Sequence, residues 1–159
     1  MFHYLLTLVF AISIGKVWAG TSGAISIPDP KTGEWCLFGV EHLGPRKLSV
    51  GETGKYVVRL ENRSACTLKH LRMLDKFPKD TDFKRADPQP SKIRNRRFPH
   101  GPILYWNQLK SRPGDIKTFE VELQVTGARN QILKNRICLS LPRDAEEVYC
   151  HYFKIRVLP

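Results

Sequence analysis

Hydrophobic and polar residues alternate along several short segments of this chain, most regularly from Phe119 to Val125. Every second residue there is apolar, and Glu120, Glu122 and Gln124 occupy the positions between them. A period of two is typical of a β-strand with one buried face, because successive side chains of a strand point to opposite sides. The segment therefore predicts a half-buried strand.

Similar patterns predict further strands. Residues 55–61 alternate in the same way, and Leu71, Met73 and Asp75 repeat the spacing before Phe77. A helical turn stays open for this second segment, since leucines at positions 68, 71 and 74 stand three apart, but a strand is preferred. Shorter apolar runs of strand length occupy residues 24–27, 35–40, 103–106, 137–141 and 148–157.

Turn-forming residues separate these runs, at residues 49–52 and 112–115 most clearly. Residues 20–33, rich in Gly, Ser, Thr and Pro, predict an extended lead-in, and several prolines among charges at 79–102 predict a long surface loop. About seven short strands without a long helical period predict an all-β fold, an immunoglobulin-like antiparallel β-sandwich over residues 34–159.

The N-terminus has the layout of a secretory signal peptide at residues 1–19. An apolar run at residues 4–14 is followed by Val17-Trp18-Ala19, which predicts cleavage after Ala19. The run is shorter than the roughly 20 residues that span a bilayer, so we expect no membrane span. A buried core helix is the alternative. The signal predicts a secreted, extracellular protein.

The cysteines that follow the predicted signal are Cys36, Cys66, Cys138 and Cys150. An even number in an exported chain favours two disulfides, and three pairings are possible. Pairing Cys138 with Cys150 is preferred, because a hairpin of the last two predicted strands would place them side by side. That choice leaves Cys36 with Cys66. None of the spacings is a short Cys-x-x-Cys, so neither a metal site nor a cofactor is expected.

A series of short motifs runs in order through residues 48–141. Its members are Val50-Gly51-Glu52, the alternating strand 56–62, Asp75-Lys76-Phe77-Pro78, Leu104-Tyr105-Trp106-Asn107, Pro113-Gly114-Asp115, the strand 119–125 and the segment 135–139. The series resembles the conserved-repeat family of cell-surface proteins known as the domain of unknown function eleven type, here in a single divergent copy. The resemblance implies an immunoglobulin-like sandwich without catalytic residues.

The motif residues have expected structural roles. Gly51 and Gly114 suit turns that need unusual backbone angles. Trp106 is expected to pack between the sheets with its ring N–H donating to a backbone carbonyl. Asn62 and Asp75 are expected to bond turn amides.

Charge adds a second feature, since 26 Lys and Arg residues against 15 Asp and Glu give a net charge of +11. Such an excess favours association with polyanions. The densest cluster, predicted to bind them, consists of Lys84, Arg85, Lys92, Arg94, Arg96 and Arg97. Two alternatives are a merely solvated loop and a furin-type processing site before Phe98. The expected partner is an extracellular protein or an acidic glycan rather than nucleic acid.

Two further candidates concern modification and catalysis. Asn62-Arg63-Ser64 is an N-glycosylation acceptor, and its use depends on the organism. The histidines are scattered singly, so the chain is expected to be a non-catalytic binding or structural module. The alternatives are a secreted basic factor of the effector or toxin kind and, less favoured, a ribonuclease-type enzyme using His70 and His151.

Overall fold

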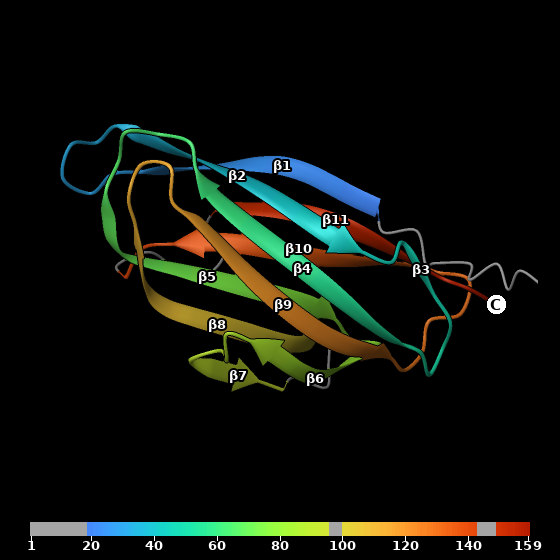
Figure 1. The fold of residues 1–159 in the computed structure, drawn as a ribbon. Helices are drawn as coiled ribbons and strands as arrows, with labels where there is room; N and C mark the ends of the chain where they lie inside the picture. Colours follow the sequence, from blue (N-terminus) through green and yellow to red (C-terminus); the bar gives the residue numbers. More distant parts are fainter. Residues whose placement is uncertain (1–18, 96–99, 143–148) are drawn as a thin grey trace, which may run out of the picture.

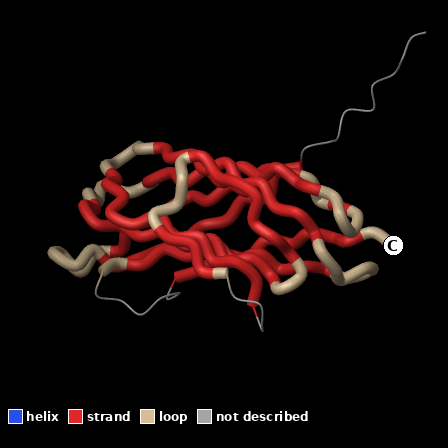
Figure 2. The backbone as a smooth tube through the Cα atoms, turned by 90° about the horizontal axis from the view of Figure 1, so that it is seen from below, coloured by secondary structure: helices blue, strands red, loops and turns tan. Residues whose placement is uncertain are grey.

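The structure, a computed structural model, describes residues 19–95, 100–142 and 149–159. The body of the predicted signal peptide lies outside these residues. Eleven strands form two sheets that pack face to face (Figure 1), and loops gather at the ends of the strands (Figure 2). Within the described residues no helix is long and apolar enough to cross a bilayer.

One sheet has five strands and the other has six. The five-stranded sheet is antiparallel and consists, in spatial order, of β1 (Ala19–Pro28), β2 (Trp35–Gly44), β4 (Thr53–Asn62), β9 (Ile116–Val125) and β6 (Thr81–Asp87). The six-stranded sheet consists of β3 (Lys47–Leu48), β11 (Tyr149–Val157), β10 (Ile132–Ser140), β5 (Leu68–Pro78), β8 (His100–Ser111) and β7 (Lys92–Arg94). Only the β3–β11 pair is parallel.

The strand order is that of an immunoglobulin-like β-sandwich, as the sequence predicts. The order β2-β4-β9-β6 corresponds to strands A, B, E and D of that fold, and β11-β10-β5 corresponds to G, F and C. One difference is that β6 precedes β8 in the chain, so the strand in the D position comes before the strand that extends the C edge. The structure also has more strands than the seven or so expected.

The core lies between the sheets and follows the alternation read from the sequence. Tyr56, Val58 and Leu60 of β4 point inward, and each is at most 2% exposed. Segment 68–78 is a strand rather than a helical turn, and its Leu71 and Met73 are fully buried. The alternation therefore predicts the inward face of both strands correctly.

The region at residues 79–102 is not the irregular loop expected from its prolines. Strand β6 pairs with β9, and β7 pairs with β8, so the region contributes an edge strand to each sheet. Pro88 and Pro90 fall between these strands, where their missing N–H groups cost no ladder hydrogen bond. The expected lead-in is likewise mostly strand, because β1 pairs with β2 along its length.

Trp106 takes the place expected for it between the sheets. Its ring is 3% exposed and lies 5.0 Å from the ring of Phe119, centroid to centroid. Its Nε1 donates to the carbonyl of Pro88 at 2.9 Å, and this bond ties the β6–β7 connection to β8. Gly51 and Gly114 have φ angles of +87° and +77°, as turns with left-handed backbone require.

The two polar motif residues differ in outcome. Asn62 accepts hydrogen bonds at Oδ1 from the backbone N–H and the hydroxyl of Ser64, so it does bond a turn amide. Asp75 instead lies within β5, buried at 1% exposure, and its side chain contacts Asn135. Its expected turn role is wrong because β5 continues through this position to Pro78.

Candidate functional site

The outer face of the five-stranded sheet carries charges of both signs. Ion pairs join Lys55 to Glu120, Arg59 to Glu41, Arg63 to Glu61 and Arg85 to Glu122. The first, second and fourth pairs join adjacent strands, where opposite charges attract across the sheet, and the Arg63–Glu61 pair lies along one edge of β4 and the residue after it. The cations of these pairs on this face are therefore matched by carboxylates.

The outer face of the six-stranded sheet is different, because the charged side chains on its strands are cationic. Facing residues in paired strands point to the same side of a sheet, so the register assigns them to this face. They are Lys47, Arg72, Lys76, Lys92, Arg94, Lys134, Arg136, Lys154 and Arg156. The only acidic residue in the described strands of this sheet is Asp75, which points into the core. We call this surface the cationic face.

The cationic face is ordered by strand pairing. Arg136 stands directly between Tyr152 on β11 and Lys76 on β5, and Lys134 stands opposite Lys154. Neighbouring strands lie about 4.8 Å apart, so cations on adjacent strands are within reach of a single sulfate or phosphate group. Regular strands thus hold the charges, and no described loop is needed to position them.

A groove of about 430 Å³ lies at one end of this face. Its cationic lining comes from Lys76, Lys79, Lys134 and Arg136, and its aromatic lining from Tyr152. Other lining residues are Phe77, Pro78, Asp80, Gln131, Ile132 and Leu133.

Two exposed apolar side chains border the groove. Tyr152 is 56% exposed and Ile132 is 51% exposed. The guanidinium carbon of Arg136 lies 5.9 Å from the centroid of the Tyr152 ring, in the range of a cation–π contact. The groove therefore combines positive charge with an accessible aromatic surface.

The basic cluster predicted from the sequence does not form one loop. Lys84 and Arg85 belong to β6 in the five-stranded sheet, where Arg85 pairs with Glu122 at 2.9 Å. Lys92 and Arg94 belong to β7, at the edge of the cationic face, and both lie over the ring of Tyr105. Arg96 and Arg97, with the predicted processing site, lie outside the described residues.

Sequence reasoning overlooked the cations of β10 and β11, although a signal was present. The triplet Lys-x-Arg occurs within strands at residues 92–94, 134–136 and 154–156, and once more at residues 110–112, where β8 ends. In a strand the first and third residues of a triplet share a face, so each triplet places two cations on one side. The density of charge along the chain does not show this arrangement, because these cations become neighbours only across the sheet.

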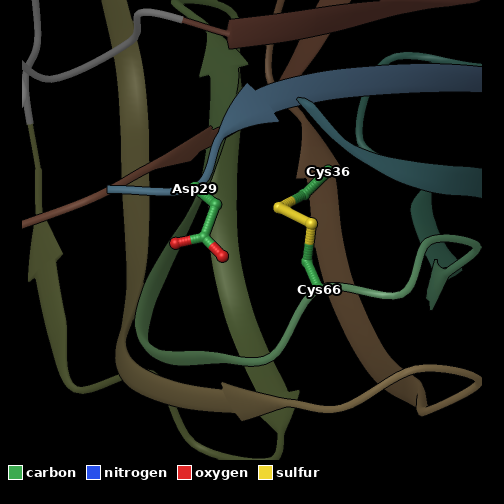
Figure 3. Close-up of side chains that lie close together, drawn as sticks. All are labelled: Asp29, Cys36 and Cys66. Carbon is green, nitrogen blue, oxygen red and sulfur yellow. A yellow bond between two sulfur atoms is a disulfide. The ribbon is translucent and has the colours of Figure 1, made fainter. Parts of the chain in front are cut away.

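Both disulfides of the preferred pairing form. Cys138 and Cys150 face each other across β10 and β11, with their Cα atoms 4.1 Å apart. Cys36 and Cys66 close the end of the sandwich near Asp29 (Figure 3). Asp29 and these two sulfurs lie close enough for a metal site, but a disulfide lacks the thiolates that bind metals. The Asp29 carboxylate also accepts the backbone N–H of Lys31.

The histidines proposed for a ribonuclease-type site face different surroundings. His70 is exposed and lines a cavity at the end of the sandwich, together with residues of the β1–β2 turn. His151 points between the sheets, where its ring lies against Gly23 and 5.0 Å from the ring of Phe153.

A third histidine, His42, is buried, and burial lowers its pKa to about 4.

Asn62 does not fit the predicted glycosylation. Its side chain is 1% exposed, and Nδ2, the atom that would carry the glycan, donates to the carbonyl of Cys66 at 2.9 Å. A glycan on this atom would break the bond and need space that the folded domain does not have. The acceptor motif is therefore a poor guide here, because Asn62 closes a turn from the inside.

Comparisons with known proteins give similarity of fold only. No family model and no curated protein matches the sequence. A CARDB domain from Pyrococcus furiosus, solved with di-metal ions, has a TM-score of 0.49 and 13% identity, with 79% of this chain and 90% of that chain covered.

Two further solved structures have lower TM-scores. The collagen-binding domain of a Staphylococcus aureus adhesin has a TM-score of 0.42 and 9% identity, with 74% and 95% of the two chains covered. AvmM, which catalyses macrocyclization in alchivemycin A biosynthesis, has a TM-score of 0.48 and 11% identity, with 88% and 89% covered.

Proposed function

We propose that this chain is a secreted, non-catalytic binding module that takes polyanions on its cationic face. The observation that carries the proposal is the segregation of charge between the two sheets. Cations of the five-stranded sheet pair with carboxylates of neighbouring positions, whereas every charged side chain that the described strands of the six-stranded sheet turn outward is a cation. Such a surface attracts a polyanion and gains entropy from released counterions.

Secretion belongs to the same proposal. It is supported by the signal-like N-terminus and by two disulfides, which form and persist in oxidising compartments. We include in the proposal the resemblance of this chain, as a single copy, to the conserved-repeat family of cell-surface proteins.

The test compares two triple variants of equal charge. The first replaces Lys134, Lys154 and Arg156 on the cationic face by alanine, and the matched control replaces Lys55, Arg59 and Arg85 on the other sheet. In the first variant, we expect the slope of log heparin affinity against log salt concentration to become shallower by about three ionic contacts. The control should behave like the unaltered protein.

Two results would contradict the proposal. One is a protein that heparin does not retain at about 150 mM salt, where screening leaves close contacts intact. The other is an equal loss in both triple variants, which would show that total charge matters and the face does not.

A second candidate is a protein-binding module that uses the five-stranded sheet. Trp35 and Leu37 of β2 are 64% and 40% exposed, and Ile116 of β9 is 51% exposed. Exposed apolar side chains of this size are common at contact surfaces. Binding through them would survive high salt and weaken in Trp35→Ala, which separates this candidate from the first.

A further inference from the structure

We infer that the groove at the end of the cationic face holds an acidic sugar ring stacked on Tyr152. The inference rests on the proposed function and names the polyanion as a sulfated or carboxylated glycan. The groove volume of about 430 Å³ lies in the range of sites for small organic ligands. The ligand enters with its anionic groups toward the lysines and its apolar ring face toward the tyrosine.

The combination of side chains in the groove selects for this chemistry. Attraction of a simple anion needs only the cations, and an exposed aromatic ring adds nothing to it. A sugar ring in contrast has an apolar face of C–H groups, which packs on an aromatic ring, and an edge of hydroxyl and acidic groups. Tyr152 is 56% exposed and stands beside Arg136, so a ring stacked on it brings its acidic group to the guanidinium.

Single-stranded nucleic acid fits this surface less well. Proteins that bind it stack successive bases on several aromatic side chains along a charged groove. On the cationic face, as far as the structure describes it, Tyr152 is the exposed aromatic residue, while Tyr105 is buried at 2% exposure beneath Lys92 and Arg94. A single stacking position among many cations therefore suits a glycan that orders one sugar ring here and contacts the other cations with the rest of its charged chain.

The experiment measures binding of Tyr152→Ala to heparin, to inorganic polyphosphate and to single-stranded DNA over a range of salt concentrations. We expect heparin affinity to fall about five- to tenfold at every salt concentration, because the lost contact is not ionic. The slope with salt should stay unchanged, since no cation is removed. Affinity for polyphosphate, which has no ring to stack, should stay the same.

Trp35→Ala is the matched control, because it removes an exposed aromatic ring from the other sheet. Its heparin affinity should equal that of the unaltered protein, and thermal unfolding of both variants confirms that they fold. Unchanged heparin affinity in Tyr152→Ala would overturn the inference while leaving the proposed function intact. A fall confined to single-stranded DNA would overturn it in favour of nucleic acid, and absence of heparin binding in the unaltered protein would defeat the proposed function itself.

Discussion

Asn62 is a polar side chain whose local sequence suggests one role and whose surroundings give it another. It forms hydrogen bonds on both sides of its amide, to Cys66 through Nδ2 and to Ser64 through Oδ1. A buried amide with all these partners stabilises the turn, and removing it leaves its partners without theirs.

We therefore predict that the protein carries no glycan on Asn62. Peptide mass spectrometry after expression in a eukaryotic host should find the unmodified residue. Asn62→Ala should lower the free energy of unfolding by about 1–3 kcal/mol, whereas Ser64→Ala, which also destroys the acceptor motif, should cost less. A glycan on Asn62, or equal costs in the two variants, would contradict this account.

Asp75 is a second buried polar residue, and it makes stability depend on pH. Burial raises the pKa of its carboxyl from 3.8 to about 8, while the neighbouring side chain of Asn135 opposes the rise. The folded protein therefore keeps a proton that the unfolded chain releases, and stability falls as pH rises between these two values. His42 acts in the opposite direction below pH 6.5, because burial lowers its pKa to about 4. The contribution of His42 dies away above pH 6.5, so of these two groups Asp75 dominates between pH 6.5 and 8.

In that range we expect the free energy of unfolding to fall by roughly 1–2 kcal/mol with rising pH. Asp75→Asn, which cannot titrate, should remove most of this dependence. Chemical denaturation at several pH values measures both. A fall of the same size in the variant would show that another group is responsible.

At the scale of strands, much of the fold can be predicted and the reason is periodicity. Strands β4 and β9 bury one face each, so apolar and polar residues alternate and the sequence shows it directly. Strands β6 and β7 are short edge strands flanked by prolines. An edge strand pairs on one side only, so it tolerates nearby prolines and need not show a regular alternation of apolar and polar residues. For that reason residues 79–102 have the composition of a loop while the chain pairs at both sheets.

The candidate site was harder to predict than the strands, because it is assembled across the sheet. Lys134 and Lys154 face each other only through the pairing of β10 with β11, and Lys76 joins them only through β5. Such neighbours are distant along the chain, and the register that unites them depends on the whole sandwich. Only the repeated Lys-x-Arg triplet could have indicated it.

The two disulfides should contribute to stability in the order of the loops they close. Cys36 and Cys66 are 30 residues apart, and Cys138 and Cys150 are 12 apart. In the chain-entropy model, replacing each pair by alanine should cost roughly 3.5 and roughly 3 kcal/mol respectively. Denaturant unfolding of the two double variants gives the order. A larger cost for the second pair would mean that packing around the fully buried Cys138 outweighs chain entropy.

At the scale of the whole molecule, a bound polyanion should cover one face and leave the other open. We predict that heparin slows acetylation of Lys134 and Lys154 by about tenfold when its concentration is ten times the dissociation constant. Acetylation of Lys55 on the five-stranded sheet should be unchanged. Mass spectrometry measures the acetylation rate of each lysine with heparin and compares it with the rate of the same lysine without heparin. Equal protection of all three lysines would contradict binding by one face.

If the cationic face binds a polyanion as proposed, the segregation of charge would also set the orientation of the bound molecule. A chain that settles on a polyanionic matrix by its six-stranded sheet turns the five-stranded sheet, with Trp35 and Leu37, toward the surrounding medium. Many copies on one matrix would then form a layer with a common, partly apolar outer surface. The protein would change what its matrix offers to a second partner, from a charged polymer to a coat of aligned sheets.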